Sequence, residues 1–272
     1  MLNKLMKYLK KKVYWTCLKT LFATLLFSVY SYAHADCDAP FISKIANQIG
    51  TKVDVYSYTK LFSCKEIEKQ GINILAFAVY NHKLTKTDPI YKNSLENDGA
   101  GLYDLTVVVA NKNNKKIIAK HIGLGVLWSD AVALGNFSIN TQYNSLNKKS
   151  LIFDVVVRNK SNSNAYISDS STLFLFEFNK GNLTQTINGL YVSNYSGNLD
   201  LDPDKNVFEY MDRKLKFKKS TSNNKPDILL SEINCQTNNE TGDCKGIANT
   251  KKIKYLLKFD GKKYPIPKKL KN

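Results

Sequence analysis

The sequence is poor in the residues that build most catalytic and metal centres. Of its 272 residues only three are histidines, and apart from His34 near the N-terminus these are His82 and His121. A centre with several histidine ligands is therefore excluded. No Gly-x-Ser-x-Gly, Walker-loop or His-Glu-x-x-His motif occurs, so the commonest hydrolase and phosphate-loop signatures are missing. A triad of His121 with Ser129 or Asp130 is a remaining alternative, but His121 lies in an expected strand, and we assign no catalytic residue.

Arginine is equally scarce. Arg158 and Arg213 stand against 38 lysines, and the formal net charge is +17. Arginine recognises phosphate through a planar fork, whereas lysine is a hydrated point charge on a flexible stem. The composition therefore indicates a diffuse basic surface and no specific nucleic-acid interface.

Acidic residues are absent before Asp36, and this segment has the organisation of a secretory signal peptide. Six lysines precede an uncharged, largely apolar stretch over residues 20–35, which ends in Ala33-His34-Ala35. A positive start, a short apolar core and a small-x-small site are the three parts of such a signal. The apolar core is short for a transmembrane helix, which needs about 20 residues. We expect residues 1–35 to be removed, with an uncleaved anchor as the alternative and lipidation at Cys37 disfavoured by Asp36.

The expected mature chain, residues 36–272, keeps most of the basic charge and an even number of cysteines. Removing six of the 40 basic residues and none of the 23 acidic ones leaves a charge of +11. The four remaining cysteines are Cys37, Cys64, Cys235 and Cys244. Four cysteines in an exported chain indicate two disulfides with three conceivable pairings. We favour Cys37–Cys64 and Cys235–Cys244 over a zinc site, because no Cys-x-x-Cys spacing is present.

Linkers and long helical patterns are also missing, so residues 36–272 are expected to form one β-rich domain. Alternation of apolar and polar residues is typical of half-buried strands. An Asp260-Gly261 turn is a strong hairpin signal. Strands are expected over residues 72–80, 103–110, 116–122, 133–140, 151–158, 173–178, 183–192, 207–218, 227–234, 253–259 and 262–266, and short helices over 41–49 and 64–69. About ten strands favour an antiparallel two-sheet sandwich, with a small β-propeller as the alternative.

Several segments resemble a family of exported bacterial β-rich proteins to which no activity is assigned. The likeness is carried by residues 101–109, 115–121, 129–134, 138–141 and 255–267. It implies an exported β-rich domain in the envelope of a Gram-negative bacterium, periplasmic or secreted. It implies no catalytic residue.

An acidic segment before the 207–218 strand has the spacing of a calcium loop. The candidate ligands are Asp200, Asp202, Asp204 and Glu209. Calcium prefers such oxygen-rich spacing, but the corresponding loop needs a glycine where this chain has Pro203. A solvated turn between strands therefore competes with a calcium site, and no other cofactor is expected.

The basic residues near the C-terminus alternate with apolar ones and define the candidate anion-binding surface. Lys214, Lys216 and Lys218 alternate with Leu215 and Phe217, which places the three lysines on one face of a strand. Lys251, Lys252, Lys254 and Lys258 are expected nearby. The leading hypothesis is a non-enzymatic envelope protein that offers these lysines to an anionic envelope component or a protein partner. The alternative is a secreted hydrolase of wall or polysaccharide substrates that uses Asp104, Glu177, Glu209 or Glu232.

Overall fold

The computed structural model describes residues 37–53, 61–93, 99–130, 132–145, 150–161, 166–198, 206–237, 244, 247 and 249–270, and every structural statement refers to these. The expected signal peptide, residues 1–35, lies outside them. Among the described residues no helix has the length and apolar character needed to cross a membrane.

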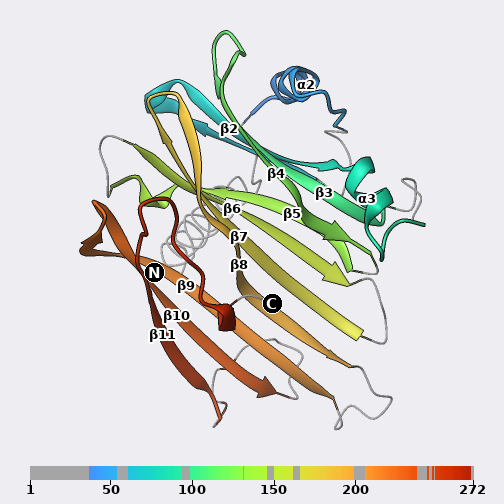
Figure 1. Cartoon of the computed structure of the whole chain (residues 1–272), viewed down its shortest axis with the longest axis vertical. Helices are drawn as coiled ribbons and strands as arrows, with labels where there is room; N and C mark the ends of the chain where they lie inside the picture. The colour runs from blue at the N-terminus through green and yellow to red at the C-terminus, as the bar shows by residue number, and fades with distance from the viewer. Residues whose placement is uncertain are drawn as a thin grey trace, which may run out of the picture. The chain divides into compact units, whose positions relative to one another are not determined.

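The described chain is an antiparallel two-sheet sandwich (Figure 1). The first sheet, sheet A, has the order β1-β2-β3-β4, and the second, sheet B, has the order β11-β10-β9-β8-β7-β6-β5. The strands are β1 Phe62–Ile67, β2 Ile72–Tyr80, β3 Gly101–Asn111, β4 Ile117–Ser129, β5 Val132–Asn140, β6 Leu151–Ser161, β7 Tyr166–Asn179, β8 Asn182–Asn198, β9 Val207–Ser222, β10 Lys225–Thr237 and β11 Lys251–Leu257. The helices are α2 Ala39–Gln48 and α3 His82–Thr87, with 3-10 turns η1 Glu68–Gln70, η3 Gln142–Ser145 and η5 Lys268–Leu270. The sandwich prediction is confirmed, whereas the propeller alternative is wrong, because the seven strands of sheet B form one continuous sheet.

The main core lies between sheet A and the β5–β7 side of sheet B. Val107 and Leu105 of β3 face it from one sheet, and Phe153 and Phe176 from the other, all fully buried. The two phenylalanine rings stack with centroids 5.6 Å apart. Burying a side chain of this size stabilises the fold by about 1.5–3 kcal/mol, so this layer is the principal source of stability.

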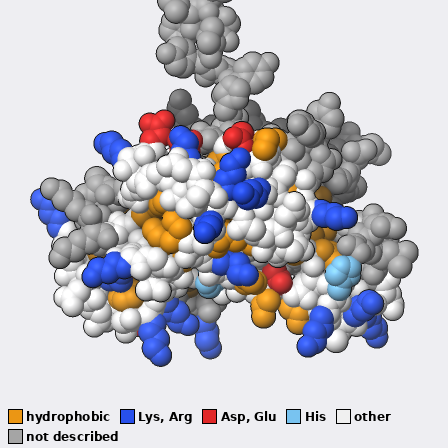
Figure 2. Space-filling model, turned by 90° about the horizontal axis from the view of Figure 1, so that it is seen from above, with side chains coloured by type: hydrophobic (Ala, Val, Ile, Leu, Met, Phe, Trp, Pro, Cys, Tyr) orange, Lys and Arg blue, Asp and Glu red, His pale blue; other side chains and the backbone are white. Residues whose placement is uncertain are grey.

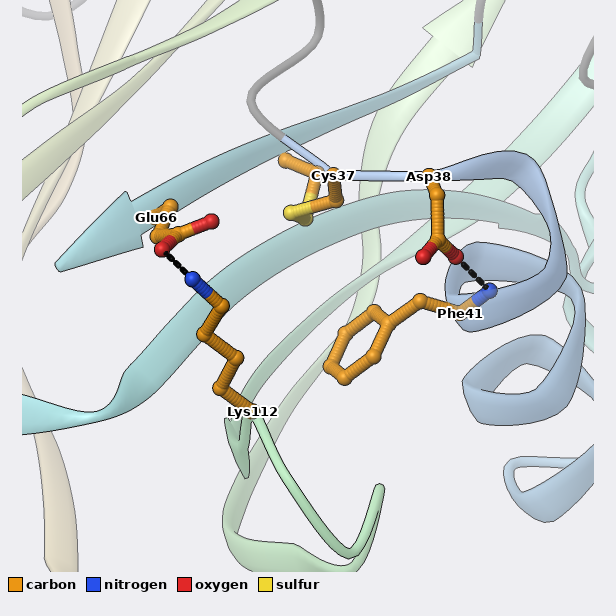
Figure 3. Close-up of a disulfide and its surroundings, with 6 residues drawn as sticks. Cys37, Asp38, Phe41, Glu66 and Lys112 are labelled. Atoms are coloured by element: carbon orange, nitrogen blue, oxygen red, sulfur yellow. Dashed lines mark hydrogen bonds and ion pairs between the residues drawn. A yellow bond between two sulfur atoms is a disulfide. The ribbon is translucent and has the colours of Figure 1, made fainter. Parts of the chain in front are cut away.

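Helix α2 covers the outer face of sheet A and is tied to it by a disulfide (Figure 3). The helix begins because the Asp38 carboxylate accepts a hydrogen bond from the Phe41 amide at 2.6 Å. Its apolar residues at helical spacing, Phe41, Ile42 and Ile45, pack on sheet A. Cys37 is bonded to Cys64 of β1, and beside it Lys112 forms an ion pair with Glu66.

Both favoured disulfides, Cys37–Cys64 and Cys235–Cys244, are present. Their Cα atoms lie 5.9 and 5.8 Å apart, within the range that a disulfide requires. The first joins the start of α2 to an edge strand, and the second fixes the segment that follows β10.

Two local predictions are wrong. Residues 64–69 were expected to be helical, but most of them form β1, where Cys64 lies opposite Leu75 of β2, so strand pairing overrides the helix propensity of Lys and Glu. Residues 262–266 were expected to be a strand paired with residues 253–259. The turn itself exists, since the amides of Lys262 and Lys263 donate to Asp260. The chain then crosses sheet B instead of returning along β11, because Tyr264 and Leu270 are buried there.

A second core lies under this crossing segment, residues 258–270, called the C-terminal segment below. Phe259, Tyr264 and Leu270 pack on Leu230 of β10 and Leu190 of β8. β8 pairs with β9 only along residues 193–198. In the part of β8 before residue 193, the C-terminal segment lies beside the strand, and the Tyr264 amide donates a hydrogen bond to the Thr186 carbonyl at 2.8 Å.

A carboxyl group is buried beside this second core. Asp154 of β6 is 1% exposed; one of its oxygens accepts from the Tyr143 hydroxyl at 2.8 Å, and the other has no hydrogen-bond partner. Burial raises the pKa of Asp154 from 3.8 to about 6, and the Tyr143 hydrogen bond offsets only part of this effect. Below about pH 6 the Asp154 carboxyl group is therefore mostly protonated in the folded state.

We predict that the contribution of Asp154 to stability falls as the pH rises from about 4 to about 6. In this pH window Asp154 is protonated in the folded protein but ionised in the unfolded chain. Raising the pH across it therefore lowers the contribution of Asp154 to the free energy of unfolding by about 3 kcal/mol. Asp154→Asn removes the titrating group. It should match the wild type near pH 4 and exceed its free energy of unfolding by about 1–3 kcal/mol near pH 8. Urea unfolding of both proteins at several pH values tests this, and parallel pH profiles for the two would contradict it.

Candidate functional site: the lysine face of β9–β11

Strands β9, β10 and β11 extend beyond the part of sheet B that sheet A covers (Figure 1). Their register is continuous from Phe217, opposite Ile228, to Phe208, opposite Thr237. Because side chains alternate along a strand, this register sorts the three strands into two faces. One face packs under the C-terminal segment, and the other carries the lysines.

The covered face is apolar where the C-terminal segment lies on it. Leu215, Leu230 and Tyr255 follow one another across the three strands, and the Lys269 ammonium lies 4.5 Å from the Tyr255 ring. Lys269 therefore lies on this side, away from the candidate face.

Arg213 and Glu232 end the apolar part of the covered face. They lie directly opposite each other on β9 and β10, their side chains are 8% and 6% exposed, and they are joined at 2.8 Å. Arg213 also donates to the carbonyls of Tyr191 at 2.8 Å and of Leu270 at 3.3 Å. This arginine therefore clamps β8, β10 and the C-terminal segment together.

The opposite face, which we call the lysine face, consists of six exposed lysines over half-buried residues of β10. Lys214 lies opposite Ser231, which in turn lies opposite Lys254. The six are Lys214, Lys216, Lys218, Lys252, Lys254 and Lys258. Lysines two residues apart on one strand lie about 6.8 Å apart, and those on β9 and β11 lie about 9.6 Å apart across β10.

Two carboxylates share the lysine face among the described residues, so lysine is in excess. Asp212 lies 3.7 Å from the Lys214 ammonium, an exposed pair that contributes little. Hydrogen bonds from Ser222 and Ser220, and the nearby charge of Lys258, keep the pKa of Asp227 below its usual value. Six lysines against these two ionised groups leave four uncompensated positive charges.

The five lysines predicted from the sequence, Lys214, Lys216, Lys218, Lys254 and Lys258, are therefore brought together. Lys252, also expected near them, lies on the same face, whereas Lys251, opposite Asn234, lies on the covered face. On the end of the molecule at the top of Figure 1, lysine and arginine side chains are dispersed among apolar ones (Figure 2).

The structure does not show the expected calcium ligands together, because most of them lie outside the described residues. Asp200, Asp202 and Asp204 lie outside the described residues, and Glu209 is an exposed residue of β9. Within the described ranges no group of three or more His, Cys, Asp or Glu side chains could hold a metal ion.

The candidate catalytic residues His121 and Asp104 contact other groups, and His121 and Ser129 lie toward opposite ends of β4. His121 packs edge-on against Phe176 at 5.5 Å, burial lowers its pKa, and Ser129 lies at the other end of the same strand. Asp104 accepts hydrogen bonds from Asn81 and the Gly125 amide.

Two of the remaining carboxylates form ion pairs. Glu177 pairs with Lys225, and Glu232 pairs with Arg213. Glu209 lies opposite Gln236, four residues along β10 from Glu232, so the Cα atoms of the two glutamates are about 14 Å apart.

No protein-family model, no curated protein and no solved structure matches the chain. The likeness to a family of exported β-rich proteins stays an expectation from the sequence. What the protein can bind is therefore argued from its geometry and charge.

Proposed function

We propose that this protein is an exported, non-enzymatic binding or envelope-accessory protein that holds an anionic envelope component on its lysine face. The observation that carries the proposal is the alignment of six exposed lysines on three neighbouring strands that sheet A leaves uncovered. The matching chemistry is that of repeated phosphate, carboxylate or sulfate groups, on a polymer or on lipid headgroups.

The spacing of the lysines supports this assignment. Backbone positions about 7–10 Å apart are comparable with the Debye length of about 8 Å at physiological salt, so the potentials of neighbouring lysines overlap at the surface. Each lysine near an anionic membrane surface contributes about 1 kcal/mol. Lysines so placed bind flexible or extended polyanions, whereas bidentate recognition of single phosphates needs arginine. Both arginines are paired with carboxylates, Arg158 with Asp169 and Arg213 with Glu232.

The two disulfides support the proposed compartment. Such bonds persist in oxidising spaces outside the cytoplasm, and residues 1–35 have the pattern of an export signal. Anionic lipids, lipopolysaccharide and wall polymers are the polyanions of that location.

We predict that neutralising four lysines of the face weakens binding to polyanions about 100-fold. The variant is Lys214→Gln/Lys216→Gln/Lys254→Gln/Lys258→Gln, and the loss corresponds to about 2.7 kcal/mol. The probes are dextran sulfate and vesicles of phosphatidylcholine with and without phosphatidylglycerol. Titration of the chain from Asp36 onward at several salt concentrations should show affinity falling steeply with salt.

The matched control removes the same charge elsewhere. Lys83, Lys86, Lys92 and Lys120 are exposed residues outside β9–β11, and glutamine at all four should change affinity by less than about threefold. Equal losses of affinity in both variants would show that binding depends only on the net charge of the protein and would refute the proposal. Affinity that does not change with salt concentration would also refute it. Preference between dextran sulfate and the anionic vesicles then distinguishes a polymer from a lipid surface.

A further inference from the structure

The covered face of β9–β11 continues past the C-terminal segment as an open groove. Its walls come from β8, β9, β10 and β11 and from the segment before β11, and it has a volume of about 1080 Å³. It begins at the Arg213–Glu232 pair, where the apolar part of the face ends. The sheet is therefore apolar where the chain covers it and polar where this groove is open.

The groove is lined mainly by groups that both donate and accept hydrogen bonds. Four amide side chains, those of Asn194, Asn234, Gln236 and Asn249, line it together with Tyr191. Amides and phenols pair in both directions with hydroxyl groups. Apolar side chains, Met211 and Ile253, lie among them.

Several of these groups are held in place before any ligand arrives. The Asn234 amide donates to Glu232 at 2.8 Å, which fixes its orientation beside the buried pair. The Asn194 oxygen accepts from the Tyr191 hydroxyl at 3.1 Å, while its nitrogen donates to Ser196 at 3.0 Å. Ordered polar groups lose less entropy on binding, so this lining is suited to recognition.

The second disulfide supports one wall of the groove. Cys235 lines it and is bonded to Cys244, whose carbonyl accepts from the Thr250 hydroxyl at 3.2 Å. Thr250 lines the groove as well. The disulfide therefore holds the wall that leads into β11.

The charges of the groove cancel, in contrast to the rest of the protein. Arg213 and Lys251 are balanced by Glu209 and Glu232, whereas the chain as a whole carries +17. A polyanion gains nothing from such a lining, and the lysine face lies on the other side of the same strands.

We propose that this groove binds an uncharged oligosaccharide. Hydroxyl-rich sugars supply the paired donors and acceptors that the amides need, and their C–H faces contact aromatic and apolar side chains. The site lies opposite the lysine face and does not depend on it. The protein thus has two binding faces, one for anions and one for neutral glycan.

The test is titration of the isotope-labelled, disulfide-bonded protein with oligomers of glucose, mannose, galactose and N-acetylglucosamine. Near 1 M NaCl the Debye length is about 3 Å, so electrostatic binding to the lysine face is screened. At least one oligomer should still shift the backbone and side-chain amide signals of Asn194, Asn234 and Gln236. No binding by any oligomer, or shifts confined to residues outside the groove, would overturn the proposal.

Variants separate the two faces. Asn234→Ala/Gln236→Ala should weaken the saccharide complex about tenfold or more, and Gln236→Ala alone, at an exposed side chain, should weaken it measurably. The four-lysine glutamine variant should bind saccharide as the wild type does. If the lysine variant loses saccharide binding and the groove variants keep it, the groove is not the site.

Discussion

Replacing Arg213 by leucine is expected to lower the free energy of unfolding by about 3–5 kcal/mol, because it leaves the Glu232 carboxylate buried without its partner. The substitution also removes the hydrogen bonds to the Tyr191 and Leu270 carbonyls, which hold the C-terminal segment on the sheet. Urea unfolding followed by circular dichroism measures the loss.

The only other arginine gives the matched control. Arg158 pairs with Asp169 but its side chain is 51% exposed, so Arg158→Leu should cost no more than about 1 kcal/mol. A second variant, Arg213→Met/Glu232→Leu, replaces the buried pair by apolar side chains and should recover much of the lost stability. Similar losses in the two single-arginine variants would show that burial of the pair is not what matters.

Removing the Cys37–Cys64 disulfide, as Cys37→Ala/Cys64→Ala, is expected to cost about 3.5 kcal/mol. The two cysteines are 27 residues apart in sequence, and closing a loop of that length lowers the entropy of the unfolded chain by about this amount. The bond also holds helix α2 against sheet A, so amide exchange in Ala39–Gln48 should accelerate more than exchange in β6.

The second disulfide is the comparison. Cys235–Cys244 spans nine residues, and its removal should cost about 2.5 kcal/mol and leave exchange in α2 unchanged. If both losses were equal and α2 stayed protected, loop length and helix attachment would not account for the contribution of the first bond.

The sequence predicted those features that depend on neighbouring residues. Alternation of apolar and polar residues predicted the two-sheet sandwich and most of its strands. Alternation also placed Lys214, Lys216 and Lys218 on one face, because every second side chain of a strand points to the same face of the sheet.

Features that depend on distant residues were missed. Residues 64–69 have helical composition but pair with β2, and only that pairing makes them a strand. The Asp260-Gly261 turn was recognised correctly, yet the path beyond it is set by burial of Tyr264 and Leu270 against strands far away in the sequence. The groove was invisible for the same reason, because it is assembled from residues between Tyr191 and Ile253.

The C-terminal segment also affects how the protein folds. Phe259, Tyr264 and Leu270, which close the second core, come after every strand that they cover. Until these three residues dock, Leu190, Phe217 and Leu230 lie open to solvent, and such transiently exposed apolar surface promotes aggregation. Proteolytic loss of the segment would therefore expose an apolar surface that chaperones and proteases recognise.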